Sequence, residues 1–327
     1  MRKLFLDANI ILDFYRYGSD DLDELQKLVA LIAGDEIKLY TNDHLRNEVK
    51  RNREGVVAQM LEELRKHKFK FRSPKICEGH EEVEKISALM KEANMLLSAL
   101  SQEVEKNAID LSLRADTFID EIFAAAQNSS VDDAKFQQAD LRCKIGSPPG
   151  KPGSLGDGIH WLSLLESDAY SLDFATKDGD FSSKLKSKTV DPFLKDEWKN
   201  EKGPHASVTL YTSLGDYLRA HFPDIKLSEE ETKNELIDQL ATSSSFASTH
   251  DIIEGLQSYS FFTAGQVSRL FGILVQNNQV GWIGEDEDVN AFFLSLKDKA
   301  YTIPNELMKP AADCLGLDEE DLFFIPF

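Results

Sequence analysis

The sequence predicts an α/β protein in which helices flank a parallel sheet, with a long helical insertion and a small, mostly helical C-terminal module. Short apolar runs alternate with amphipathic helical segments through residues 1–222, and this alternation is typical of parallel sheets. Neither Pro nor Gly occurs between Glu81 and Gln127, which indicates an extended helical stretch. Beyond residue 228, apolar and aromatic residues recur at helical spacing.

The elements of the sheet domain follow one another along the chain. Strands are expected at residues 3–6, 37–40, 170–176 and 207–211. A helix at 21–33 precedes the second strand, and Thr41 or Asn42 can cap the helix that follows it. The Gly-, Pro- and Ser-rich residues 145–158 form a loop, and Asp157 then opens another helix. With a last helix at 214–221, the sheet domain spans residues 1–222.

The helical insertion is expected at about residues 81–144. Its apolar positions step by four and three residues, as in a heptad seam with one polar position. This pattern predicts one long helix or a bent pair of helices. The seam either packs on the protein's own sheet domain or pairs two chains, and the spacing leaves both open. It consists of Ile86, Met90, Ala93, Leu97, Leu100, Val104, Asn107 and Leu111.

The C-terminal module, residues 228–327, is strongly acidic. From Ser228 onward there are five Lys or Arg and eighteen Asp or Glu. Such a charge repels nucleic acid, so the aromatic residues here are expected to form a helical core rather than a surface for stacking bases. These aromatic residues are Phe261, Phe262, Phe271, Trp282, Phe292 and Phe293.

Composition excludes several classes of protein. No apolar run approaches the ~18 residues of a membrane helix, and Asp7 comes too early for a signal peptide, so we expect a cytoplasmic protein without a membrane partner. The three cysteines, at positions 77, 143 and 314, are too far apart to indicate a disulfide framework or a zinc site. The net charge of −20 argues against loose electrostatic binding to nucleic acid by the chain as a whole.

Four acidic residues lie where ligands gather in a parallel sheet, beyond the carboxyl ends of the strands. Asp7 and Asp178 each follow a strand, Glu48 lies on the helix after the second strand, and Asp157 starts the helix after the loop. Each acid alone also fits a helix cap. Together, four converging carboxylates would repel one another unless a divalent cation lies between them, and oxygen ligands suit Mg²⁺ or Mn²⁺.

The motifs around these acids are LFLDANIILDF at Asp7, NDHLRNEV at Glu48, GSLGDGIHWLSLLE at Asp157 and DFATKDGDF at Asp178. In this order they resemble the PIN-domain nucleases, in particular the larger bacterial PIN-like proteins with a helical insertion. The resemblance covers roughly residues 1–222, and the helical segment is its least typical part.

The resemblance implies a metal-dependent endoribonuclease that hydrolyses RNA phosphodiester bonds, with a role as a toxin or phage-defence effector. Asp7, Glu48, Asp157 and Asp178 would be the catalytic metal ligands. Asn9 and Thr176 would be auxiliary polar residues, and Asp180 would assist or replace Asp178. Two alternatives stay open: a non-catalytic PIN-fold scaffold that binds RNA or protein, and a structure-specific DNA nuclease.

Basic residues concentrate between Arg46 and Lys75, where ten Lys or Arg stand against four acids. Because they begin beside Glu48, they are expected to bind the phosphates of an RNA substrate. The alternative is a solvated face that pairs with the acidic C-terminal module. His160, one helical turn after Asp157, is expected on the surface or at the edge of the site. The residues assigned to substrate binding are Lys50, Arg51, Arg53, Lys144 and Lys151.

Overall fold

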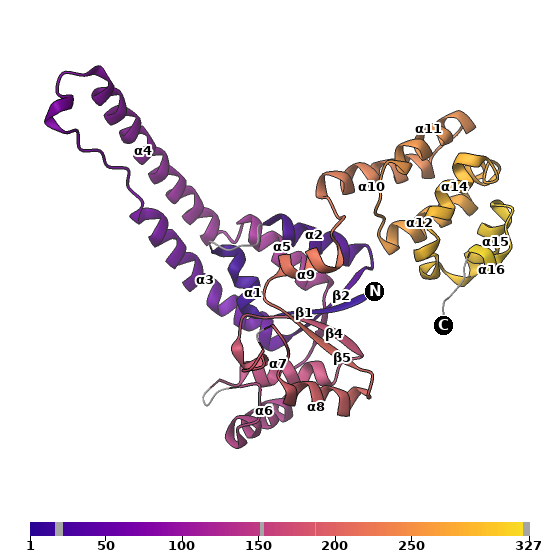
Figure 1. Cartoon of the computed structure of the whole chain (residues 1–327), viewed down its shortest axis with the longest axis horizontal. Helices are drawn as coiled ribbons and strands as arrows, with labels where there is room; N and C mark the ends of the chain where they lie inside the picture. Colours follow the sequence, from indigo (N-terminus) through magenta and orange to yellow (C-terminus); the bar gives the residue numbers. More distant parts are fainter. Residues whose placement is uncertain (17–21, 151–153, 187, 323–327) are drawn as a thin grey trace. The chain divides into compact units, whose positions relative to one another are not determined.

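A five-stranded parallel sheet, in the order β3-β2-β1-β4-β5, organises the fold (Figure 1). The computed structural model describes residues 1–16, 22–150, 154–186 and 188–322. The strands are β1 (Arg2–Leu6), β2 (Ile37–Asn42), β3 (Gln127–Ser129), β4 (Ser171–Ala175) and β5 (Ser207–Tyr211). The α/β class and the four expected strands are confirmed. The sequence missed β3, because three polar residues carry no apolar signal.

Buried strands lead directly into helices whose first residues are capped by polar side chains. Leu4, Phe5 and Leu6 of β1 are buried, and Asp7 then caps α1 (Ala8–Leu12), which continues into the 3₁₀ turn η1 (Asp13–Tyr15). Asn42, the last residue of β2, caps α3 (Asp43–Lys66) through its side-chain oxygen. This local chemistry fixes acidic and amide side chains at the carboxyl edge of the sheet.

Apart from the helices of the arm described below, five further helices and a 3₁₀ turn lie in the described part of the first 221 residues, and all but α9, which follows the last strand, connect strands. They are α2 (Leu22–Ala33), α6 (Asp133–Ile145), α7 (Gly156–Leu165), the 3₁₀ turn η3 (Gly179–Phe181), α8 (Pro192–Lys202) and α9 (Leu214–His221). No helix among the described residues is long and apolar enough to cross a membrane.

A helical arm extends from the sheet: α3 runs outward, residues 67–80 turn at the tip, and α4 (Glu81–Ile109) returns antiparallel to α3 (Figure 1). The short turn η2 (Lys75–Cys77) lies in the tip. After α4 the chain bends at Leu111, whose φ of 53° ends the helix, and α5 (Arg114–Ala125) follows. The expected bent helical pair is therefore confirmed as α4 and α5.

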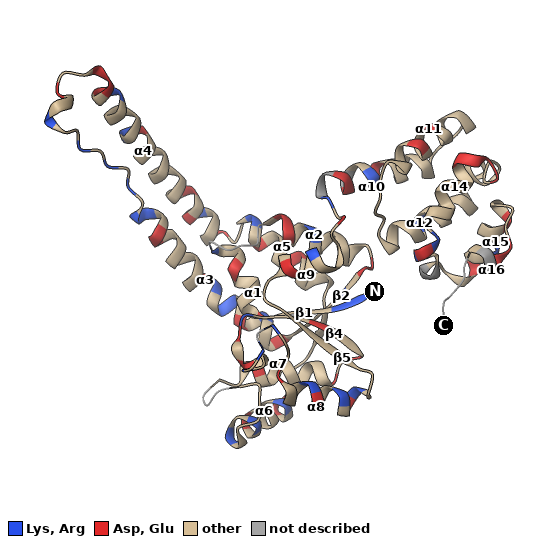
Figure 2. Ribbon diagram, viewed as in Figure 1, with Lys and Arg blue, Asp and Glu red and all other residues tan. Residues whose placement is uncertain are grey.

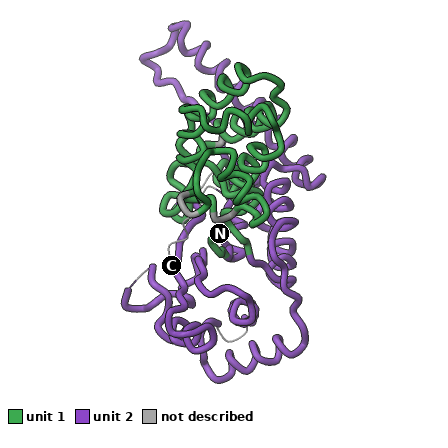
Figure 3. The backbone as a smooth tube through the Cα atoms, turned by 90° about the vertical axis from the view of Figure 1, so that its right-hand side faces the viewer, with its two compact units in different colours: residues 1–4, 23–39, 216–327 green, residues 5–22, 40–215 purple. Residues whose placement is uncertain are grey.

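The described chain divides into two compact units, shown in Figure 3: residues 1–4, 23–39 and 216–327 form one, and 5–22 and 40–215 form the other. The sequence-based division into domains 1–222 and 228–327 stays a prediction. We call the first group the C-terminal unit because most of it lies in the last third of the chain. It contains α10 (Leu227–Ala241), α11 (Phe246–Gln257), α12 (Ala264–Gln276), α13 (Asn278–Gly281), α14 (Glu287–Ser295), η4 (Lys297–Thr302), α15 (Asn305–Cys314) and α16 (Glu319–Leu322).

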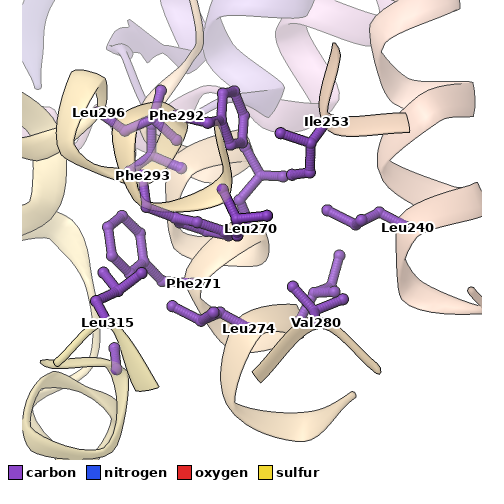
Figure 4. Close-up of a cluster of buried hydrophobic side chains, with 14 of the residues drawn as sticks. Leu240, Ile253, Leu270, Phe271, Leu274, Val280, Phe292, Phe293, Leu296 and Leu315 are labelled. Atoms are coloured by element: carbon purple, nitrogen blue, oxygen red, sulfur yellow. The ribbon is translucent and has the colours of Figure 1, made fainter. Parts of the chain in front are cut away.

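The core of the C-terminal unit is apolar and aromatic, as the sequence predicts (Figure 4). Phe271, Phe292 and Phe293 are buried in it. Trp282 is an exception to the prediction, because 70% of it is exposed. Trp282 follows the short helix α13. Its ring packs edge to face with the ring of the exposed Phe246 at the surface of the unit, and the two ring centroids are 6.4 Å apart.

Within the same unit, the C-terminal helices are attached to the turn that follows α2. The Gly265 N–H donates to the Gly34 carbonyl at 2.9 Å, and the Ala264 N–H donates to the Glu36 carboxylate at 2.9 Å. Lys299 pairs with the same carboxylate. A Cβ on Gly34 would lie 2.5 Å from the Thr263 side chain, so this contact requires glycine.

Candidate metal centre

Three carboxylates meet at the carboxyl edge of the sheet. Asp157 lies in the first turn of α7, and Asp178 and Asp180 lie in the turn after β4. One carboxylate oxygen from each lies within 4.8 Å of those from the other two. The Asp178 carboxylate also accepts the Asp180 N–H at 2.9 Å, which shapes the turn. An oxygen cluster of this size matches what a hard divalent cation requires.

Asp7 lies next to this cluster and is held by its neighbours. Its side chain is 4% exposed, and one carboxylate oxygen accepts the Ala8 N–H at 2.7 Å. The other oxygen accepts hydrogen bonds from Asn9 Nδ2 and Thr176 Oγ1, each at 2.6 Å. Thr176 Oγ1 in turn accepts the Asp178 N–H at 2.9 Å, so this hydroxyl links the two acids. Asn9 and Thr176 thus hold Asp7, which fits the auxiliary role that the resemblance implies.

Glu48 is held by His160, which the sequence analysis expects on the surface or at the edge of the site. His160 is 1% exposed, and its Nε2 lies 3.2 Å from the Glu48 carboxylate. The Asn42 side-chain oxygen accepts the Leu45 N–H at 2.9 Å, so the Asn42 amide faces His160 Nδ1 at 3.1 Å as a donor. Nδ1 is therefore the acceptor, and Nε2 carries the hydrogen that is donated to Glu48.

Helical spacing from Asp157 could have placed His160 at the site. The two residues are three positions apart, and such residues lie on the same face of a helix. The first turn of α7 also packs closely on α3: a Cβ on Gly156 would lie 3.3 Å from His44 Nε2 and 3.5 Å from Glu48 Oε2. This proximity brings Glu48 to Asp157 of α7, although sequence spacing gives no sign of it.

The electrostatics of the cluster favour a bound cation. Burial, followed by the charges of Asp7 and Asp178, raises the pKa of Asp157 to about 7. Burial also raises the pKa of Asp7, against the opposing hydrogen bond from Thr176. The hydrogen bond from His160 lowers the pKa of Glu48. A divalent ion would relieve this repulsion, and Asp157, Asp178 and Asp180 supply the oxygen ligands that Mg²⁺ or Mn²⁺ prefers.

Two of the expected phosphate-binding residues lie exposed on α3 near the cluster. Lys50 and Arg51 follow Glu48 within one helical turn, and the Arg51 charge contributes to the lowered pKa of Glu48. Figure 2 shows basic residues on α3 and on the segment that leads to the tip of the arm, and others on α4. The side chains of Lys50 and Arg51 therefore lie in solvent beside Glu48.

The other expected phosphate-binding residues are differently placed. Arg53 forms a two-pronged ion pair with Asp116, with N–O distances of 2.5 and 2.6 Å, and the two side chains are 13% and 6% exposed. Its guanidinium therefore fastens the base of the arm to α5, and we leave it out of the substrate surface. Lys144 is exposed and pairs with Asp140 at 2.5 Å. Lys151 lies outside the described residues.

Comparison with known proteins bears on the N-terminal part of the chain. A family model described as a PIN like domain matches residues 3–150. These residues form a PIN-like domain. The matched region contains Asp7, Glu48 and the whole helical arm, so the arm lies inside the family's region, and Asp157, Asp178 and Asp180 follow it. Searches of the curated proteins and of the solved structures found no match.

Proposed function

We propose that this protein is a metal-dependent endonuclease that hydrolyses RNA phosphodiester bonds. The observation that supports it most is the group of three carboxylates, from Asp157, Asp178 and Asp180, beside the buried Asp7 in a PIN-like domain. A divalent ion held there would lower the pKa of a bound water and neutralise charge on the scissile phosphate.

Each residue of the site has a separate part in this proposal. Asp157, Asp178 and Asp180 hold the ion. Asp7 completes the site with a carboxylate that is held in place by hydrogen bonds from Thr176 and Asn9 to one of its oxygens. Glu48 contributes a carboxylate whose direction is set by His160. Mg²⁺ and Mn²⁺ both suit these oxygen ligands.

The binding of a nucleic acid strand rests on the exposed cations Lys50 and Arg51 beside Glu48, and the choice of RNA over DNA rests on the family resemblance alone. In a chain with a net charge of −20, phosphates that flank the scissile bond need such local cations. We expect Lys50→Ala with Arg51→Ala to weaken RNA binding and to reduce the slope of log K against log salt by about 1–2, since each phosphate contact contributes about 0.7 on a single strand. Binding curves at several salt concentrations, in Ca²⁺ to limit cleavage, measure this, and an unchanged slope would remove these residues from the substrate surface.

Cleavage of labelled RNA and DNA oligonucleotides in Mg²⁺, Mn²⁺ and EDTA tests the function itself. Asp7→Asn and Asp157→Asn are expected to abolish cleavage, whereas Asp140→Asn, a change in a carboxylate of α6 outside the cluster, should retain it. Cleavage of DNA but not RNA would favour the structure-specific DNA nuclease. Binding of RNA without cleavage would favour the scaffold. The role as a toxin or phage-defence effector rests on the family resemblance alone.

A further inference from the structure

The helix α4 carries two apolar stripes, only one of which packs within the arm. Leu97 and Val104 line hollows formed with α3 and with residues 67–68, and Met90 lines one formed with residues 69–72. The segment at residue 69 is fixed to α4 by Asn94, whose side chain exchanges two hydrogen bonds of 3.0 Å with the Phe69 backbone. This stripe is the inner face of the arm.

The second stripe lies on the outer face of α4. Leu89 and Leu96 are 65% and 66% exposed, Leu100 is 48% exposed, and Ile86 is 37% exposed. With Ala93 between them, these residues step by three and four along the helix. Ser101 is the only fully buried residue in α4 as the structure describes it, so most of this 29-residue helix is uncovered. The seam expected from the sequence combined residues of both stripes.

The spacing of the outer stripe indicates that another helix covers it. Apolar residues at alternating steps of three and four form the contact line of a coiled coil. Ala99, one helical turn after Leu96, borders the stripe and is exposed, and its small side chain allows a second helix to approach closely. An isolated exposed apolar residue needs no explanation, but a continuous stripe of this kind on a projecting arm does.

The charges at the two ends of the stripe identify the second helix. Glu82 and Lys85 precede it, and Glu103 and Lys106 follow it, and all four side chains are exposed. In an antiparallel pair of α4 helices with Leu89 facing Leu100 and Ala93 facing Leu96, Lys85 of one chain lies beside Glu103 of the other. The same register places Glu82 beside Lys106. A parallel pair would bring like charges together instead.

We propose that the outer face of α4, defined by Leu89, Ala93, Leu96 and Leu100, binds the same face of a second copy of this chain in an antiparallel arrangement. The interface is isologous, because each copy offers the same stripe and the same pairs of charges. The proposal concerns the arm alone and does not depend on the nuclease function.

The mass of the full-length protein in solution tests the pairing. We expect wild type to be a dimer by multi-angle light scattering and sedimentation at about 50 µM, a concentration that detects micromolar association. Leu89→Glu with Leu96→Glu should give a monomer with an unchanged circular dichroism spectrum, since both side chains are exposed. The matched control is Leu141→Glu with Ile145→Glu on α6, where the side chains are 57% and 68% exposed. The control should remain a dimer, and a monomeric wild type would overturn the proposal.

Reversal of charge tests the antiparallel arrangement. Lys85→Glu places two acids together at both ends of the symmetric interface and should weaken the dimer about tenfold. Adding Glu103→Lys to the same chain restores opposite charges and should recover the wild-type dissociation constant. If the double variant dimerises no better than Lys85→Glu alone, the antiparallel register is wrong.

Discussion

Asp157 shows how burial and neighbouring charge act on one carboxyl group. Its pKa is raised to about 7 by burial and by the charges of Asp7, Asp178 and Glu48, and only His160 opposes them. The folded state therefore holds the proton more tightly than the unfolded state. In the metal-free protein this contribution to stability is complete below about pH 4 and is lost as the pH rises through about 7.

We accordingly expect Asp157→Asn to stabilise the metal-free protein at pH 8 and to have little effect at pH 4. The gain should be about 1–2 kcal/mol, because solvent at the partly exposed side chain screens part of the repulsion. Urea titrations in EDTA at the two pH values measure it. Mn²⁺ should reverse the order by stabilising wild type and not the variant. A variant that is less stable than wild type at pH 8 in EDTA would show that the carboxylates do not repel one another.

We expect His160 to act through Glu48 rather than on substrate. Because Asn42 donates to Nδ1, the ring should carry its hydrogen on Nε2, and ¹⁵N spectra of the neutral histidine should show this tautomer. Loss of the ring in His160→Ala should weaken Mn²⁺ binding about 10- to 100-fold, the usual cost of removing a residue that orients a ligand. Titration calorimetry measures the affinity. The opposite tautomer, or an unchanged Mn²⁺ affinity, would remove His160 from this role.

At the level of elements, the arm is fastened at its base by one buried ion pair. Arg53 of α3 binds Asp116 of α5 and donates to the Ala108 carbonyl of α4 at 3.1 Å. Arg53→Ala leaves a buried carboxylate without its cation, and we expect a loss of about 3–5 kcal/mol in unfolding free energy. Lys50→Ala, an exposed change three residues earlier on α3, should change stability by less than about 0.5 kcal/mol. Equal effects of the two changes on chemical denaturation would contradict this distinction.

At the level of the whole chain, the last third folds with a short piece of the N-terminal region. The Gly34 carbonyl accepts the Gly265 N–H, and the Glu36 carboxylate accepts the Ala264 N–H. The residues of each pair are more than 200 positions apart in sequence. Such contacts make the C-terminal unit discontinuous in sequence.

A substitution at Gly34 tests this attachment. Gly34→Ala places a methyl group 2.5 Å from Thr263, so the C-terminal helices should open more readily and be cleaved faster by a protease at low concentration. Gly55→Ala is the matched control: its Cβ meets nothing within 4 Å inside α3, and alanine there should stabilise the helix by about 0.5–1 kcal/mol. Equal cleavage rates for Gly34→Ala and wild type would show that the contact does not hold the unit together.

The sequence by itself determined the parts of this protein that depend on local patterns. Apolar runs that end at polar caps located four strands and the acids Asp7 and Asp178, and the end of the Gly-, Pro- and Ser-rich loop located Asp157, because strand burial and helix starts are decided by neighbouring residues. Unbroken helical spacing located α4, and the aromatic residues after 228 located most of a helical core. The PIN-like resemblance came from the same local motifs.

Only the tertiary structure decided what distant residues do to one another. Arg53 and Lys50 are both basic residues of the same segment of sequence. In the structure Arg53 pairs with Asp116 at the base of the arm, whereas Lys50 is exposed to solvent. His160 becomes a partner of Glu48 because α7 packs on α3, and Trp282 is exposed because its helix ends at the surface. Both stripes of α4 repeat with the period of the helix, so only the position of α3 shows which stripe is exposed to solvent. Burial and charge pairing depend on contacts across the chain, and sequence periodicity does not record those contacts.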